Sequence, residues 1–234
     1  MINKLLWNND QILYMFRKNI VEYDMQAASL SVSRRFKLID ETRLIQLEQM
    51  PKEQRTVQVG LMQKENKEFS ERMIQGIIQT RQEFLDKNHI TENDILCCHS
   101  DAVIFNQKKG HIHDSIDNVK FVNKNQWTSY MYYNGIEIYY ADGFITYKGI
   151  PKEKLKMHTL GINKYLIEIF QMIEDYDDNI FKHMRKFQER YLLEKLPSYY
   201  YYPFGRNGGH KIANLDLFAF LANVVLEDRY EKHW

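Results

Sequence analysis

The stretch Ile95-Leu-Cys-Cys-His-Ser-Asp101-Ala-Val-Ile-Phe105 decides the fold of this chain. It is apolar on both sides of a polar centre, and β-branched residues lie at its far end, so two short strands are favoured over one helix. The strands are expected to turn at His99, Ser100 and Asp101, because short polar side chains suit turns. The stretch therefore predicts a buried hairpin with an acid, Asp101, at its tip.

A second acid ends a second predicted strand. Residues 19–24 read Asn-Ile-Val-Glu-Tyr-Asp, which places Asp24 at the strand end. Helical patterns follow at 27–48 and at 60–87, where apolar residues recur every three or four positions. If a helix crosses between adjacent strands of one sheet, Asp24 and Asp101 come together. Two carboxylates on a rigid platform suit divalent metal ions and phosphoryl transfer.

The rest of the chain is expected to be a β region followed by helices. Asp142-Gly143 is a typical type I′ turn pair between two strands. The element order predicts an α/β (α+β) fold with a small sheet crossed by helices, a β-hairpin region and a helical C-terminal lobe. We expect domains at 1–150 and 151–234. The predicted strands are 119–122, 128–133, 136–140 and 144–147, the helices are 153–175, 178–195 and 212–230, and 205–211 is a basic loop.

The composition of the chain excludes some classes of function. The 234 residues carry a net charge of +1, which excludes a uniformly basic DNA-coating protein but permits a local positive cleft. No apolar run approaches the length of a membrane span, and the N-terminus lacks the layout of a signal peptide. Cys97 and Cys98 are adjacent in an apolar run, so we expect free thiols in a reducing compartment. These features predict a cytoplasmic protein without a membrane partner.

Two segments resemble the catalytic motifs of family-B DNA polymerases. Glu22-Tyr-Asp24-Met-Gln-Ala-Ala-Ser29-Leu30 resembles the first motif, in which an acid at a strand end precedes a Ser-Leu pair at a turn into a helix. The hairpin at 95–105 resembles the third motif, which carries a metal-binding acid at its tip. The order of motifs is most similar to the protein-primed phage members, over residues 19–156.

Two further segments resemble strands that hold the primer in that family. One contains Lys124 and Tyr130, and the other is Tyr147-Lys148-Gly149-Ile150-Pro151, in the place of the strand before the thumb. The resemblance implies a palm-like sheet with a thumb-like lobe, and nucleotidyl transfer with Mg²⁺ (or Mn²⁺) as cofactor. Its partners would be nucleotides and a nucleic-acid primer and template. The implied roles are metal ligation by Asp24 and Asp101 and primer contact by Lys124, Tyr130 and Lys148. Triphosphate binding is expected of Arg55 and Lys64, which belong to the stretch nearest to the fingers motif of the family.

The chain also departs from the family pattern. Ser29-Leu30 lies two residues farther from the acid, and His99 replaces the first acid of the third motif. The Lys-x3-Asn-Ser-x-Tyr-Gly fingers motif is missing and there is no room for an exonuclease domain. Several alternatives therefore stay open. The chain is a minimal polymerase, the catalytic half of a split polymerase, a degenerate relative, or a non-catalytic nucleic-acid-binding or accessory subunit. In the plainest alternative, Asp24 caps a helix and Asp101 is an ordinary turn residue.

Overall fold

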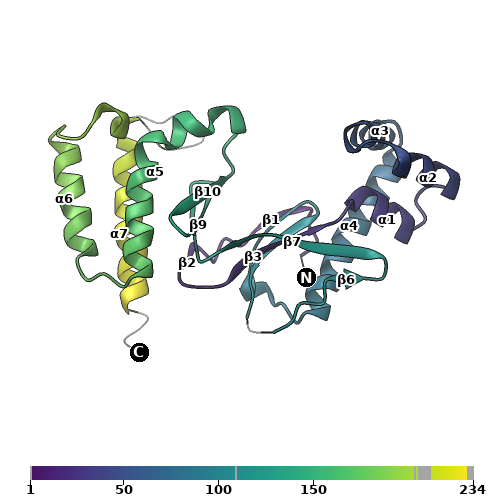
Figure 1. Cartoon of the computed structure of the whole chain (residues 1–234), viewed down its shortest axis with the longest axis horizontal. Helices are drawn as coiled ribbons and strands as arrows, with labels where there is room; N and C mark the ends of the chain where they lie inside the picture. Colours follow the sequence, from purple (N-terminus) through teal and green to yellow (C-terminus); the bar gives the residue numbers. More distant parts are fainter. Residues whose placement is uncertain (1, 109, 203, 205–211, 231–234) are drawn as a thin grey trace. The chain divides into compact units, whose positions relative to one another are not determined.

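The chain folds as two compact units (Figure 1). The computed structural model describes residues 2–108, 110–202, 204 and 212–230, so the predicted loop at 205–211 lies outside the described residues. Unit 1 comprises residues 1–10 and 20–126, and unit 2 comprises residues 11–19 and 127–234. This division differs from the predicted boundary at residue 150, because the β-hairpin region shares a hydrophobic core with the C-terminal helices.

Unit 1 contains a six-stranded sheet with the strand order β1-β4-β5-β3-β7-β6. The pairs β1–β4, β4–β5, β3–β5 and β6–β7 are antiparallel. The strands are β1 (Leu6–Asn8), β3 (Ile20–Met25), β4 (Ile95–His99), β5 (Ala102–Asn106), β6 (Ser115–Ile116) and β7 (Val119–Trp127).

The predicted hairpin is confirmed as β4 and β5. His99 pairs with Ala102, and Ser100 adopts a positive φ of 56°, so the chain reverses over Ser100 and Asp101. Strand β3 lies next to β5 with Asp24 opposite Ala102. The backbone N–H of Met25 donates to the carbonyl oxygen of Asp101 at 3.1 Å. The two strand ends that carry the acids are therefore adjacent, as predicted.

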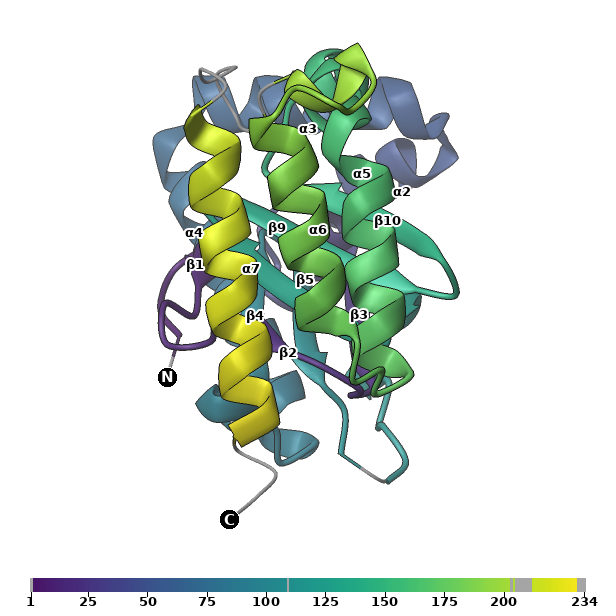
Figure 2. The same cartoon turned by 90° about the vertical axis from the view of Figure 1, so that its left-hand side faces the viewer.

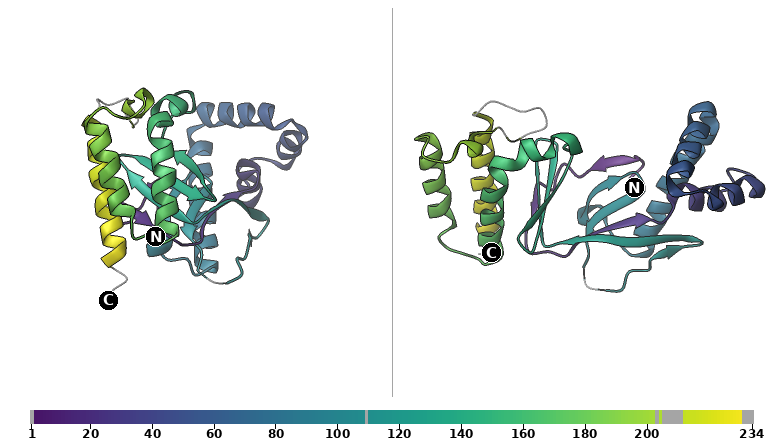
Figure 3. Two further views of the ribbon diagram at one scale, coloured as in Figure 1. Left: turned by 60° about the vertical axis from the view of Figure 1, so that its left-hand side comes forward. Right: turned by 45° about the horizontal axis from the view of Figure 1, so that its top comes forward.

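The long helix of unit 1 packs on the sheet, and the shorter helices gather beyond one end of it (Figure 3). Apolar residues of the long helix, such as Met73, Ile77 and Phe84, join a core with Val21 and Phe121 of the sheet. The Phe84 and Phe121 rings stack at 4.0 Å. The helices are α1 (Ala28–Arg35), α2 (Glu41–Gln49), α3 (Lys52–Glu65), α4 (Lys67–Lys87) and a 3₁₀ turn, η1 (Glu92–Asp94).

Two of the predicted helices were wrong in extent. The helix expected at 27–48 is divided into α1 and α2, because the Asp40 side chain caps α2 by accepting from the N–H of Arg43. The helix expected at 60–87 is divided into α3 and α4, because Asn66 caps α4 by accepting from the N–H of Phe69. Helix α3 therefore begins earlier than expected, at Lys52.

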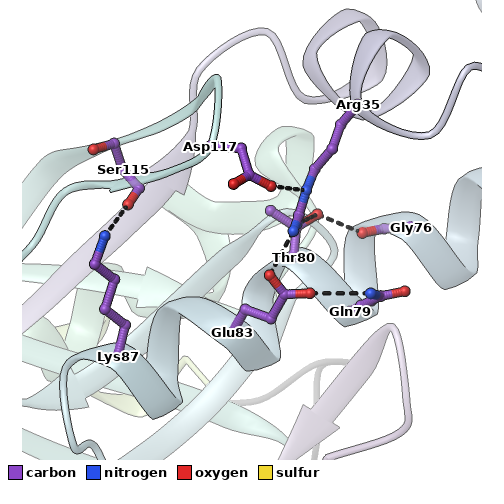
Figure 4. A network of polar contacts seen from close by, with 8 residues as sticks. All are labelled: Arg35, Gly76, Gln79, Thr80, Glu83, Lys87, Ser115 and Asp117. Carbon is purple, nitrogen blue, oxygen red and sulfur yellow. Dashed lines mark hydrogen bonds and ion pairs between the residues drawn. The ribbon is translucent and has the colours of Figure 1, made fainter.

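An arginine whose side chain is 11% exposed, Arg35, links α1 to α4 (Figure 4). The Arg35 guanidinium donates to Thr80 Oγ1 and to Asp117 Oδ2, each at 2.9 Å, and pairs with Glu83. The two helices approach closely at Gly76, where an added Cβ would lie 2.6 Å from a methyl carbon of Val32. Helix α1 is thus held in one position on α4.

Unit 2 is a four-stranded antiparallel sheet covered by helices (Figure 2). Its strand order is β10-β9-β8-β2. Asp142 and Gly143 have φ values of 49° and 81°, which confirms the predicted type I′ turn. No helix of the described residues is long and apolar enough to cross a bilayer. The elements are β2 (Tyr14–Met15), β8 (Ser129–Tyr133), β9 (Ile136–Ala141), β10 (Phe144–Lys148), α5 (Lys152–Glu174), α6 (Ile180–Leu192), η2 (Ser198–Tyr201) and α7 (Ile212–Tyr230).

Candidate functional site

A polar cavity of about 440 Å³ opens in unit 1 where β3 ends. Its walls are the start of α1, one face of α3, the β4–β5 turn and one residue of β7. Four residues that the sequence singled out line this single cavity: Asp24, Arg55, Asp101 and Lys124. They come from four different parts of unit 1, so the fold, and not local sequence, brings them together.

The carboxylates of Asp24 and Asp101, which lie on adjacent strands, interact electrostatically. The pKa of Asp101 is raised, first by burial and then by the negative charge of Asp24. A cation between two such carboxylates relieves this repulsion, and carboxylate oxygen is the ligand that Mg²⁺ prefers. The donor set of Asp24 and Asp101 therefore fits a divalent metal ion.

Lys124 of β7 forms an ion pair with Asp24 at the edge of the cavity. The Lys124 side chain is 54% exposed, whereas that of Asp24 is 14% exposed. The hydrogen bond to Asp24 is the main cause that raises the pKa of Lys124, so the amine stays charged. The ammonium group thus neutralises one of the two acids, and a metal ion at Asp24 would have to compete with it.

One face of α3 forms the cationic wall of the cavity. Arg55 lies on this face, but Lys64 does not line the cavity. The reason is helical geometry, since Lys64 lies one residue beyond the lining residue Gln63 and is rotated away by about 100°. The sequence did not single out Lys52, although it lies three positions before Arg55 on the same face. The α3 residues that line the cavity are Lys52, Arg55, Thr56, Val59, Gly60 and Gln63.

The N-terminus of α1 adds backbone donors to the opposite wall. Ala27 precedes the helix in a left-handed conformation, with φ 48° and ψ 48°, and no side chain caps the helix. The N–H groups of Leu30 and Ser31 donate to the Ala27 carbonyl oxygen. Within the described residues, the N–H groups of Ala28 and Ser29 have no acceptor. Uncapped N–H groups at a helix start attract anions such as phosphate.

Arg81 of α4 supports the turn that carries Asp101. This arginine is 1% exposed, and its guanidinium donates to the backbone carbonyl oxygens of Ser100 at 2.7 Å, of Leu5 at 3.0 Å, and of Lys4. It therefore fixes the backbone next to Asp101 without lining the cavity. Arg81 was not predicted from the sequence. The available signal was a single basic residue on the apolar face of a long helix, where an unpaired charge is rarely tolerated.

The other two predicted primer contacts, Tyr130 and Lys148, belong to unit 2. The Tyr130 ring is 1% exposed and packs against Tyr139 at 5.1 Å, so it is a core residue and presents no surface to a ligand. The Lys148 ammonium group lies over the rings of Trp127 and Tyr139, at 5.6 and 5.8 Å. Only Lys124 of the three predicted primer contacts lines the cavity of unit 1.

The sequence model of the family described as Bacteriophage PBS1 gene 130 protein matches residues 1–232, so this chain belongs to that family. The match confirms the prediction of a phage protein. No curated protein matches the chain. The family description names a phage gene product and states no activity, so the resemblance to polymerases stays a prediction.

Proposed function

We propose that unit 1 is a metal-dependent nucleotidyltransferase of the DNA-polymerase type. The observation that carries the proposal is the convergence of Asp24, Asp101, Arg55 and Lys124 on one cavity. The proposed reaction transfers a nucleotidyl group from a deoxynucleoside triphosphate to the 3′-hydroxyl of a primer. It belongs to phage replication in the cytoplasm of the host.

Each wall of the cavity has a role in this proposal. Asp24 and Asp101 would hold Mg²⁺ or Mn²⁺. A bound metal ion would polarise the α-phosphate and activate the attacking 3′-hydroxyl. Arg55 would neutralise the triphosphate, together with Lys52 on the same face of α3. The free N–H groups at the start of α1 would be further donors to phosphate oxygens. Lys124 would bind a primer phosphate once its ammonium group leaves Asp24.

Two observations favour a second candidate, a nucleic-acid-binding or accessory subunit that performs no chemistry. Lys124 neutralises Asp24, and His99 stands where the resemblance expects another acid. Under this candidate the cavity binds nucleotide or strand phosphates, and a second polymerase subunit performs the transfer. Lys148 would then add to a phosphate-binding surface on unit 2.

Primer extension tests the enzymatic proposal. The purified chain is incubated with a primed template, deoxynucleoside triphosphates and either Mg²⁺ or Mn²⁺, and extension is measured on a gel. We expect extension by the unchanged chain and a loss of at least roughly a hundredfold in Asp24→Asn and in Asp101→Asn, because each variant removes a metal ligand. Asp114→Asn is the matched control, since this acid is 54% exposed and does not line the cavity.

Extension that survives both substitutions would refute the catalytic assignment. If the unchanged chain shows no extension but binds primed DNA with strong salt dependence, the second candidate is favoured.

A metal titration without nucleic acid tests whether the ammonium group of Lys124 competes with a metal ion for Asp24. We expect Lys124→Met to bind Mn²⁺ roughly tenfold more tightly than the unchanged chain, because an ammonium group no longer competes for Asp24. Lys120→Met is the control on the same strand, since Lys120 contacts Asp114 at 4.0 Å and lies outside the cavity. Calorimetry measures both affinities. Equal Mn²⁺ affinity in all three proteins would exclude a metal ion at Asp24.

A further inference from the structure

Unit 2 contains its own polar cavity, of about 310 Å³, between α5, α6 and η2. It is separate in sequence from the cavity of unit 1 and shares no residue with it. The residues that line it are Lys164, Glu168, His183, Lys186, Phe187, Arg190, Leu196, Pro197, Tyr199 and Tyr200.

Three cations surround this cavity. Lys186 and Arg190 lie one turn apart on α6, and Lys164 lies on α5. None of the three has a carboxylate partner among the residues that the structure describes. The one acid in the described lining, Glu168, lies 3.2 Å from His183. The cavity therefore carries a positive charge that its own carboxylate does not balance.

Aromatic side chains form the other part of the lining. The Tyr199 and Tyr200 rings lie 4.6 Å apart, and Tyr200 meets Phe187 edge-on at 5.5 Å. Tyr200 is buried, whereas Tyr199 is 37% exposed, so a flat ligand can reach the Tyr199 ring. Glycine at 161 lets η2 approach α5, because an added Cβ there would lie 1.9 Å from the Tyr199 carbonyl oxygen. The aromatic wall is therefore fixed against the helix that carries Lys164.

We propose that this cavity binds a nucleoside phosphate, with Lys164, Lys186 and Arg190 around the phosphate and Tyr199 stacked on the base. Clustered cations select an anion, and an accessible aromatic ring adds a preference for a flat ring on the same ligand. Glu168 and His183 offer hydrogen-bonding atoms to the polar edge of a base. A plain carboxylate or inorganic anion would use the cations and leave the aromatic wall unused.

Free nucleotides and strand ends share this chemistry. A mononucleotide presents a phosphate and one base, and so does the 5′-phosphorylated end of a single strand. The inference stands without the proposed reaction of unit 1, because none of its residues lies in that unit.

Binding measurements on the full chain test the inference. Calorimetry and fluorescence anisotropy are performed in EDTA with three probes: thymidine monophosphate, a 5′-phosphorylated oligothymidylate and the same oligonucleotide with a 5′-hydroxyl. Binding of the monophosphate indicates a free nucleotide as ligand. Binding of the phosphorylated strand alone, well above its 5′-hydroxyl form, indicates a strand end. If the monophosphate does not bind and the two oligonucleotides bind equally, the inference is wrong.

Variants locate the binding. We expect Arg190→Gln and Tyr199→Ala each to weaken binding roughly tenfold, because one removes a charge-assisted hydrogen bond and the other a stacking surface. Arg185→Gln is the matched control on α6, since Arg185 contacts Glu189 and does not line the cavity. It should leave the affinity within about twofold. Arg55→Gln tests whether the probe binds in the cavity of unit 1 instead. Affinity that falls in Arg55→Gln and is unchanged in Arg190→Gln would assign the binding to unit 1 and overturn the inference.

Discussion

Arg81 shows how one buried side chain determines the position of another residue. Its planar guanidinium reaches three backbone carbonyl oxygens at once, including that of Ser100 beside Asp101. A lysine has a single ammonium group and cannot reproduce this fork. We expect Arg81→Lys to lower the free energy of unfolding by about 2–3 kcal/mol, because buried carbonyl groups lose their donors. Urea unfolding measures the change.

Arg72→Lys is the matched control for this substitution. Arg72 lies on the same helix, but it is exposed, and among the described residues its guanidinium contacts the Phe36 carbonyl oxygen alone, at 3.5 Å. Its replacement should change the free energy of unfolding by less than about 0.5 kcal/mol. Equal effects of the two substitutions would show that Arg81 does not hold the turn.

Asp101 makes the stability of the chain depend on pH. Burial and the charge of Asp24 raise its pKa, so the folded chain keeps this proton to a higher pH than the unfolded chain does. The free energy of unfolding therefore falls as the pH rises from about 4 through the folded-state pKa of Asp101. Asparagine does not titrate. We expect Asp101→Asn to be more stable than the unchanged chain at pH 7 and equally stable near pH 3.

Urea unfolding at the two pH values checks this expectation. Asp114→Asn serves as the control, because Asp114 is exposed and should show no comparable gain at pH 7. A constant difference in the free energy of unfolding between Asp101→Asn and the unchanged chain from pH 3 to pH 7 would show that the ionisation of Asp101 is not the cause.

At the scale of single residues, the sequence predicted best those candidate site residues that lie at the ends of strands. Asp24 and Asp101 could be predicted as neighbours because each follows a short apolar run that reads as a strand. The place of Lys52 in the cavity and the partners of Arg81 could not be predicted, because they depend on where a helix begins and on which backbone carbonyls it meets. Tyr130 was misplaced because its sequence context shows a strand but not that both faces of this strand are buried, as they are at Tyr130 and Met131.

Among the elements, the contact of α1 with α4 depends on a glycine. An added methyl group at Gly76 would lie 2.6 Å from Val32 and 3.0 Å from the Phe36 ring. At Gly60 on α3, an added methyl group meets nothing within 4 Å. We expect Gly76→Ala to destabilise unit 1 by about 1–3 kcal/mol, because overpacking outweighs the gain in helix propensity.

Gly60→Ala is the matched substitution, and its expected effect on the free energy of unfolding has the opposite sign. It gains helix propensity without a clash, so the free energy of unfolding should rise by up to about 1 kcal/mol. Thermal unfolding followed by circular dichroism compares the two variants. A stabilised Gly76→Ala would mean that the close approach of α1 and α4 is not required.

Helix boundaries show what periodicity cannot tell. Residues 63–68, around Asn66, are all polar, so the apolar periodicity that begins at Phe69 does not show whether one helix or two cover 60–87. The break follows from a local hydrogen bond, in which Asn66 accepts from the N–H of Phe69 at 2.9 Å. Asparagine competes with helical backbone bonds for such donors, and this was the available signal. The break matters for the site, because it makes α3 a separate helix that turns Arg55 toward the cavity.

At the scale of the whole molecule, the path of the chain was the least predictable feature. Residues 11–19 belong to unit 2, although the segments on both sides of them belong to unit 1. Tyr14 and Met15 form β2 and pair with Met131 and Tyr130, which lie more than a hundred residues later. A two-residue strand has no recognisable period, and nothing local identifies so distant a partner. The α+β class itself was predictable, because it follows from the order of the longer elements.

Arg17 secures this early segment within unit 2. Its guanidinium pairs with Asp228 of α7 and donates to the Ile173 carbonyl oxygen of α5 at 2.9 Å. It also lies 4.5 Å from the centre of the Tyr176 ring. The side chains of Arg17 and Asp228 are only 13% and 12% exposed. We expect Arg17→Met to destabilise unit 2 by about 3 kcal/mol, because it leaves a largely buried carboxylate without its partner.

Hydrogen exchange read by mass spectrometry tests this expectation unit by unit. Amide protection in α5 and α7 should fall, whereas protection in α4 and β5 should stay unchanged, because Arg17 and its contacts belong to unit 2. Arg185→Met is the control, since its contact with Glu189 is exposed and contributes little. Equal losses in both units would show that they unfold together. Unchanged protection in α5 and α7 would show that residues 11–19 are not needed to stabilise unit 2.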